Sequence, residues 1–325
     1  MCNSRSMFLC LSLVIIVGCL RIAAAPATQQ TSATYAQSQR YSVLLEEHTT
    51  GVIYRIVLRV LDKQTSGTRR VELRERYREV TQMQVHHNRY LIIIGTLPLG
   101  GHIISFLDLD TGILLNRIWC YGYAFSPRKN KIVYLTHYPR ITPPMFHKSI
   151  VLLYDLQLPA DRYPNYSENG MNYGIPVFPE INTLSKSYDV TLDEEYIYAS
   201  PFLWSEDEER IVTIVRDTGQ SKYYVISIDL HANKGEPVIR RKDLLEAAVG
   251  LKERLEKEEK LKDFRLRVND LRWIGPNEIL AIPNPQHWLP KEMILRIGPI
   301  NNDVLLADVG SVPHKERGSA GGMMA

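Results

Sequence analysis

Beyond Tyr41, the hydrophobic residues of this 325-residue chain alternate with polar ones or form short β-branched and aromatic runs. Such patterns are typical of β-strands, in which successive side chains point to opposite faces of a sheet. Turn-forming residues such as those at 65–68 and 110–112 separate the runs. Most of the chain is therefore predicted to be β-structure, with strands at 52–60, 71–77, 90–95, 103–109 and 113–119.

A short pattern recurs along these strands. The segment 125–134 (FSPRKNKIVY) aligns without gaps with 204–213 (WSEDEERIVT): each has an aromatic residue, a serine, a polar turn, a basic residue and a strand. Looser copies begin at Val85 and Trp273, so the intervals between successive copies are 40, 79 and 69 residues. The middle interval spans about two repeats, which predicts a repeated β-unit of about 40 residues. Four aromatic residues are predicted to be core anchors of these units: Trp119, Phe125, Trp204 and Trp273.

The repeat resembles that of TolB-type, WD40-like β-propellers, in which aromatic-Ser-Pro-Asp-Gly-Lys-x-Ile-Ala opens one strand. Ser126-Pro127 and the run 131–134 match this pattern, whereas Arg128-Lys129 and Asp207-Glu208 replace the Asp-Gly of the turn. The resemblance implies an all-β, β-propeller-like fold over 41–312 with about 4–6 four-stranded blades, which bury their faces by radial stacking. A β-sandwich is the alternative.

Two segments interrupt the repeat. Residues 139–179 hold many prolines and tyrosines and are predicted to form an insertion loop, without strand periodicity from 158 to 179. Residues 243–262 are predicted to form one inserted amphipathic helix, which Asp243 and Glu246 cap and whose apolar face includes Leu251 and Leu255.

The N-terminus is predicted to carry an export signal. Residues 7–20 are apolar and follow Arg5, and this segment is too short for a spanning helix of about 20 residues. Residues 1–27 are predicted to be a signal peptide, with 28–40 a flexible linker and 313–325 a flexible tail. In a second interpretation, 16–19 resembles a bacterial lipobox in which Cys19 is acylated. We therefore expect an exported protein, periplasmic or extracellular, which contacts a membrane only through a lipid on Cys19.

The composition of the chain excludes several kinds of partner and site. The chain is 45% hydrophobic and 23% charged, with a formal net charge of +3. Lys and Arg are interleaved with acidic residues, so no nucleic-acid partner is predicted. Beyond the signal only Cys120 remains, which excludes an internal disulfide and a cysteine zinc site; it is expected to be a buried, inert thiol.

No catalytic motif for a serine hydrolase, zinc peptidase or nucleotide-binding enzyme occurs in the sequence. His86 and His87 adjoin a strand and are expected to point to opposite faces, and the acidic residues at 108, 110 and 207–209 are expected to serve turns. No catalytic residue, cofactor or metal site is predicted.

The expected function is binding of a protein or glycan partner in the cell envelope, without catalysis. Tyrosine-rich loops are adhesive, so the candidate binding residues lie in or beside the insertion: Tyr163, Tyr166, Tyr173, His137 and His147. Two alternatives are a hydrolase or lyase with its site in the propeller channel, and a structural envelope lipoprotein.

Overall fold

The computed structural model describes residues 34–50, 54–137, 149–163, 174–178, 196–233, 236–285, 289–297 and 304–305. These residues form five antiparallel sheets, which follow one another in chain order except that the last strand, at 304–305, returns to the fourth sheet. Sheet 1 contains β1 (Tyr35–Gln37), β2 (Tyr41–Thr49), β3 (Arg55–Asp62) and β4 (Gly67–Leu73), and sheet 2 contains β5 (Glu79–His86), β6 (Tyr90–Thr96), β7 (His102–Asp108) and β8 (Leu114–Cys120).

Sheet 3 contains β9 (Gly122–Phe125), β10 (Lys131–His137), β11 (Ser149–Asp155) and β12 (Ile175–Phe178), with the short 3₁₀ helix η1 (Ala160–Arg162) between its last two strands. Sheet 4 contains β13 (Tyr196–Tyr198), β14 (Leu203–Trp204), β15 (Arg210–Asp217), β16 (Lys222–Asn233), β17 (Glu236–Asp243) and β21 (Val304–Leu305). Sheet 5 contains β18 (Val268–Gly275), β19 (Glu278–Pro283) and β20 (Met293–Arg296).

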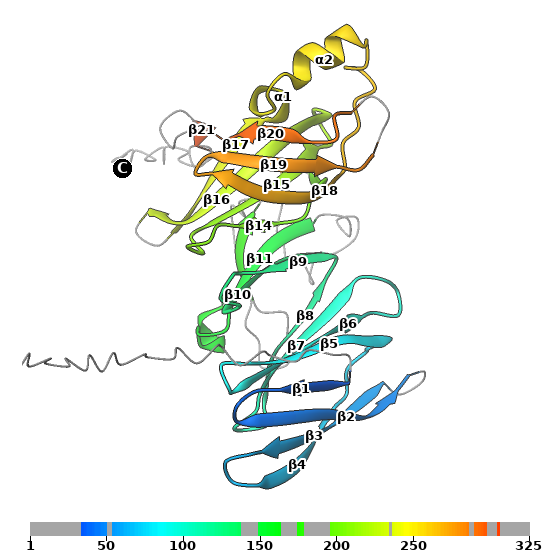
Figure 1. The fold of residues 1–325 in the computed structure, drawn as a ribbon, viewed down its shortest axis with the longest axis vertical. Coiled ribbons are helices and arrows are strands. Elements are labelled where there is room, and N and C mark those ends of the chain that lie inside the picture. The colour runs from blue at the N-terminus through cyan, green and yellow to red at the C-terminus, as the bar shows by residue number, and fades with distance from the viewer. Residues whose placement is uncertain are drawn as a thin grey trace, which may run out of the picture.

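The sheets stack face to face along the long axis of the molecule, from sheet 1 at the bottom of Figure 1 to sheet 5 at the top. Four hydrophobic clusters fill the four interfaces between successive sheets. This arrangement confirms the predicted all-β, β-propeller-like fold, with four strands in three of the five sheets, and the two-sheet sandwich alternative is wrong. In the part of the chain that the structure describes, no cluster joins sheet 5 to sheet 1, so the stack is open.

The repeated sequence pattern makes the same contacts in neighbouring sheets. Ser126 Oγ accepts a hydrogen bond from the Lys131 amide (3.2 Å), and Ser205 Oγ accepts one from the Arg210 amide (2.9 Å), which closes each turn. The second turn position, which is glycine in the repeat that the sequence resembles, holds Lys129 (φ 59°) and Glu208 (φ 64°), and both residues have left-handed conformations.

Side chains at this repeat also tie each sheet to the one before it. Trp204 donates its indole N–H to the carbonyl of Ala124 (3.0 Å), and Trp273 donates to the carbonyl of Trp204 (2.9 Å). Lys129 Nζ donates to Gln84 Oε1 (3.0 Å), while the Glu208 carboxylate accepts from the Arg128 amide. The repeat therefore sets the spacing between sheets as well as the turn.

The predicted anchors differ in their surroundings. Trp204 is buried between sheets 3 and 4, and Phe125 and Trp273 pack against the adjoining clusters. The prediction for Trp119 is wrong, because its side chain is 43% exposed. Ile118 and Cys120 take the inward positions on this strand, and Trp119 lies on the opposite face at the outer edge of sheet 2.

Two predicted segments contain strands. The linker 28–40 includes β1, whose Ala36 is fully buried in the cluster between sheets 1 and 2. The insertion 139–179 includes β11 and β12, which complete sheet 3. β1 has three residues and β12 has four, which is too few for a period-two pattern of hydrophobic residues to be recognised.

The predicted helix 243–262 is also interrupted. It forms α1 (Leu244–Ala247) and α2 (Leu251–Lys257), between which Gly250 adopts a left-handed conformation (φ 71°). The Asp243 carboxylate caps α1 by accepting from the Leu245 amide (2.9 Å). Ala248 pairs with β20 instead of continuing the helix, and the predicted apolar face lies buried against sheets 4 and 5.

Candidate functional site

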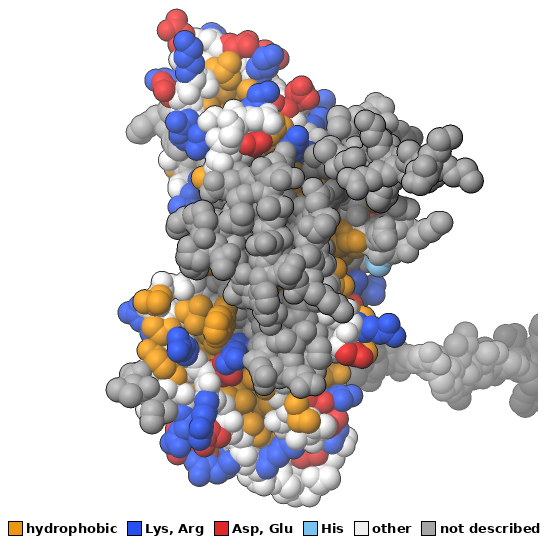
Figure 2. All heavy atoms as spheres, turned by 180° about the vertical axis from the view of Figure 1, so that it is seen from behind, with side chains coloured by type: hydrophobic (Ala, Val, Ile, Leu, Met, Phe, Trp, Pro, Cys, Tyr) orange, Lys and Arg blue, Asp and Glu red, His pale blue; other side chains and the backbone are white. Residues whose placement is uncertain are grey.

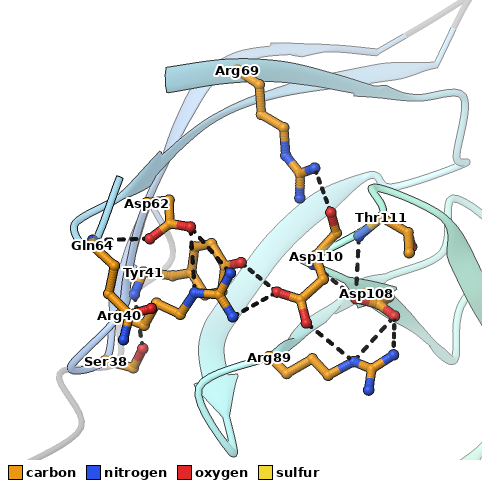
Figure 3. A network of polar contacts seen from close by, with 10 residues as sticks. All are labelled: Ser38, Arg40, Tyr41, Asp62, Gln64, Arg69, Arg89, Asp108, Asp110 and Thr111. Carbon is orange, nitrogen blue, oxygen red and sulfur yellow. Dashed lines mark hydrogen bonds and ion pairs between the residues drawn. The ribbon is translucent and has the colours of Figure 1, made fainter. Parts of the chain in front are cut away.

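A network of arginine and aspartate side chains joins sheet 1 to sheet 2 (Figure 3). Arg40, at the turn before β2, pairs with Asp62 (3.2 Å) and with Asp110 of the next sheet (2.8 Å). The Tyr41 hydroxyl donates to the same Asp110 carboxylate (2.6 Å). Turns of two sheets are thus held together by charge-assisted hydrogen bonds.

Asp108 organises the sheet 2 side of this network. Its Oδ1 accepts from the backbone amides of Asp110 (2.8 Å) and Thr111 (3.4 Å), and its Oδ2 pairs with Arg89 (2.7 Å). The prediction that Asp108 serves a turn is therefore confirmed, whereas the Asp110 carboxylate links sheet 2 to sheet 1.

The surroundings of Asp108 and Tyr41 keep each of them in one protonation state at neutral pH. Burial alone would raise the pKa of Asp108, but the hydrogen bonds from Arg89 and two backbone amides outweigh it and leave that pKa below its usual value. Burial and the hydrogen bond to Asp110 raise the pKa of Tyr41 to about 12. Asp108 is consequently ionised and Tyr41 protonated at neutral pH, which suits a structural clamp.

A cleft of about 310 Å³ opens beside the network. Arg69 donates Nη1 to the backbone carbonyl of Asp110 (3.0 Å) at its wall. The charged residues that line this cleft are Arg40, Arg69, Asp62 and Asp110, and their formal charges cancel. The cleft has no surplus charge with which to select an ionic ligand.

A larger cleft of about 430 Å³ lies where the β14–β15 turn of sheet 4 meets the β18–β19 turn of sheet 5. We call it the acidic cleft. Four carboxylates and one guanidinium line it, beside the Trp273 ring; the complete lining is Ser205, Glu206, Asp207, Glu209, Arg210, Asp229, Trp273, Gly275 and Pro276.

The charges of the acidic cleft are only partly compensated. Arg210 donates to the carbonyl of Pro276 (3.3 Å) and its guanidinium lies over the Trp273 ring, 5.8 Å from the centroid. Asp229 lies 3.7 Å from Arg240. A hydrogen bond from Ser205 and one from the Glu209 amide lower the pKa of Asp207, so its charge persists in mildly acidic solution.

His86 and His87 lie together, contrary to the prediction that they point apart. Their ring centroids are 3.8 Å apart, and Nε2 of each faces Asn130 Oδ1, at 3.2 and 2.5 Å. His87 has left the strand for a left-handed turn conformation (φ 49°), which rotates its side chain towards its neighbour. Burial lowers the pKa of His86, which keeps it neutral.

The predicted binding residues have different outcomes. Tyr163 does not lie on a contact surface: it is 3% exposed, packs on Tyr154 and donates its hydroxyl to the Asp155 carbonyl (2.5 Å). His137 ends β10, but its side chain lies outside the described residues. Tyr166, Tyr173, His147 and Cys19 also lie outside them.

Cys120 is buried, as predicted, and burial raises the pKa of its thiol. Within the described ranges, no three His, Cys, Asp or Glu residues lie close enough to hold a metal ion. The described helices include none long and apolar enough to cross a membrane.

The sequence analysis did not predict the acidic cleft, because the acidic residues at 207–209 have the pattern of a solvent-exposed turn. A signal was present in the repeat itself, since the turn 128–131 is basic where its copy at 207–210 is acidic. Trp273 was expected to be core, and it does pack against the core, but one part of it borders the cleft.

No family model and no curated protein matches the chain. Among solved structures, it is similar to the β-propeller domain of the Trilobed protease from Pyrococcus furiosus (10% identity, TM-score 0.33, 76% of this chain and 62% of that one). It is also similar to a prolyl endopeptidase (11% identity, TM-score 0.34, 78% of this chain and 32% of that one). A third similar structure is TolB from Acinetobacter baumannii (12% identity, TM-score 0.29, 75% of this chain and 51% of that one). The chain spans less than two thirds of the length of each of these solved chains.

Proposed function

We propose that this protein is an exported, non-catalytic binding protein of the cell envelope, which holds a basic segment of a protein partner in the acidic cleft. The observation that carries the proposal is the cleft's surplus of carboxylates beside an indole ring. Export rests on the apolar segment 7–20, and a TolB-like role in the periplasm is the finer expectation from the sequence repeat.

A lysine or arginine side chain suits this cleft in two ways. Glu206, Asp207 and Glu209 come from one turn and present negative charge at its rim. The Trp273 ring offers an apolar surface for the methylene stem of a lysine or arginine, and Arg210 already lies over that ring in a cation–π geometry. A partner's cation could take the place of Arg210 or lie beside it.

The arginine–aspartate network supports a non-catalytic role. The pKa values of Asp62 and Asp108 are lowered and that of Tyr41 is raised, so these three groups exchange no protons near neutral pH. Tyr166, Tyr173 and His147 remain proposed contacts of a second surface, which single substitutions would test.

The test compares two charge-matched variants of the full chain. Glu206→Gln/Glu209→Gln removes two charges from the cleft, whereas Glu253→Gln/Glu256→Gln removes two exposed charges from α2. Binding of a fluorescent lysine-rich peptide is titrated at low and at physiological salt. We expect the cleft variant to bind about tenfold more weakly and to depend less on salt, because each lost charge reduces electrostatic attraction.

The same variants then serve as baits for partners from solubilised envelope. A partner retained by the α2 variant and lost by the cleft variant supports the proposal. Equal peptide affinity of both variants, or a wild-type protein that binds no basic peptide, overturns it.

A further inference from the structure

The β6–β7 hairpin carries a fully exposed leucine at its tip. The Gly100 amide donates a hydrogen bond to the Leu97 carbonyl (3.1 Å), which closes the turn. The side chain of Leu99, between these two residues, is entirely exposed. Gly100 and Gly101 follow with positive φ angles. The hairpin therefore ends in an apolar side chain aimed at solvent.

Tyr121 lies beside this tip, and Trp119 lies two residues earlier in the chain, on β8, opposite Ile103. Tyr121 is 57% exposed and Trp119 43% exposed, and a Cβ atom at Gly101 would lie 3.7 Å from the Tyr121 ring. Figure 2 shows hydrophobic side chains gathered in the lower half of the face seen from behind, with basic side chains among them. We call Leu99, Trp119 and Tyr121 the apolar tip.

Three exposed arginines run along the chain segment next to this tip. Between β4 and β5 the side chains alternate, so that Glu75 and Tyr77 are buried while Arg74, Arg76 and Arg78 are exposed. The Arg78 amide donates to the Thr96 carbonyl (2.8 Å), and Arg117 pairs with Glu75 (2.6 Å), which brings the segment against β6 and β8. Glu72 pairs with Arg74 (3.5 Å), and Glu79 is exposed nearby.

We propose that the apolar tip docks on the surface of an anionic lipid bilayer, with Leu99 inserted among the acyl chains. Tryptophan and tyrosine prefer the level of the lipid headgroups, where the ring is apolar and its polar edge stays wet. Arg76 and Arg78 supply the positive charge that complements anionic headgroups. This contact is distinct from the acidic cleft, because the β6–β7 turn lies at the opposite ends of the strands from the β5–β6, β9–β10 and β14–β15 turns, which contact one another in series. The cleft therefore stays open to a partner.

The experiment measures sedimentation of the full chain with vesicles. The protein carries Cys19→Ser, so that no lipid anchor contributes, and the vesicles contain either phosphatidylcholine alone or an equal mixture with phosphatidylglycerol. Leu99→Ser is compared with Ile113→Ser, which removes an exposed side chain from the β7–β8 turn at the other end of the same sheet. Neither side chain supports the core.

We expect Leu99→Ser to lower partitioning onto the mixed vesicles about tenfold, the value of one inserted leucine, and Ile113→Ser to leave it unchanged. Arg76→Gln/Arg78→Gln should lower it only on vesicles that contain phosphatidylglycerol. Vesicles should also shift the tryptophan emission to shorter wavelength, and Trp119→Phe should remove that shift. Equal partitioning of the Leu99 and Ile113 variants, or a shift that survives Trp119→Phe, overturns the proposal and leaves the tip as a contact for a protein.

Discussion

Trp119 and Trp204 show how the position of a side chain on its strand decides its role. Both are followed or preceded by hydrophobic residues, so the sequence predicts burial for both. Trp204 belongs to the two-residue strand β14, which pairs, among the described strands, only with β15, and it is enclosed by sheets 3 and 4, with its N–H donated to the carbonyl of Ala124. Trp119 belongs to the edge strand β8 and lies on the face opposite Ile118 and Cys120, where its side chain is 43% exposed.

The charge on Asp108 should contribute to stability only above acidic pH. Because its pKa is lowered on folding, this contribution is complete above the unfolded value of about 3.9 and is lost as the pH falls through the folded value. Asp108→Asn keeps an oxygen acceptor for the turn but loses the ion pair with Arg89. We expect the variant to lose roughly 1–2 kcal/mol of unfolding free energy at pH 7, and the difference to vanish in strong acid.

Urea unfolding at several pH values measures this difference. Asp270→Asn is the matched control, because Asp270 pairs with Arg272 on an exposed face and should change stability by less than about 0.5 kcal/mol. An Asp108→Asn deficit that persists unchanged at pH 2 would contradict the assigned cause.

At the scale of elements, the spacing of hydrophobic residues along the chain predicted the strands that have a clear apolar face. β6, β7 and β8 agree with their predicted ranges to within one residue. β1 and β12 were missed because they are three and four residues long and take their burial from neighbouring sheets. A pattern of period two needs more residues than these strands possess.

The helical segment shows a second limit of sequence patterns. The apolar face of 243–262 was predicted well, but the competing pairing of Ala248 with β20 is a contact between residues far apart in the chain. No local pattern contains it. Gly250 allows the break, since a left-handed conformation costs other residues about 1–2 kcal/mol.

Gly250→Ala should therefore reduce the unfolding free energy by roughly 1–2 kcal/mol. The cost is purely conformational, because a Cβ atom at Gly250 meets nothing within 4 Å. Gly122→Ala is the control: its Cβ also meets nothing, and its φ is not left-handed. Denaturant unfolding of the two variants measures the difference, and equal stability would refute the explanation.

At the scale of the whole molecule, the repeat predicted the kind of unit and a range for its number, and five sheets fall within that range. The openness of the stack was not predictable. Each interface is made by two successive sheets. The residues that form these interfaces would be the same in a closed ring and in an open stack, so they do not reveal which of the two forms. The acidic cleft depends on the same long-range order, because it needs the turns of sheets 4 and 5 side by side.

An open stack should respond locally to damage. In a linear array each sheet is stabilised by its immediate neighbours only. Leu295→Ala in sheet 5 and Leu91→Ala in sheet 2 remove equally buried side chains from different interfaces, at a cost of about 2–5 kcal/mol each.

Hydrogen exchange measured by mass spectrometry should show faster exchange in sheets 4 and 5 for Leu295→Ala, and in sheets 1 and 2 for Leu91→Ala. The double variant should show the sum of the two effects. Faster exchange in sheet 1 caused by Leu295→Ala would instead indicate that the two ends of the stack are coupled.

The left-handed turn residues have a consequence for the order of the sheets. Lys129 donates to an amide oxygen in sheet 2, whereas Glu208, at the same place in the next repeat, accepts from a backbone amide in sheet 3. A glycine at either place would relax the backbone but would fit against any neighbour. A donor at one junction and an acceptor at the next make the repeats non-interchangeable, so each sheet is matched to its own predecessor and duplicated units of one chain are kept from assembling in the wrong sequence.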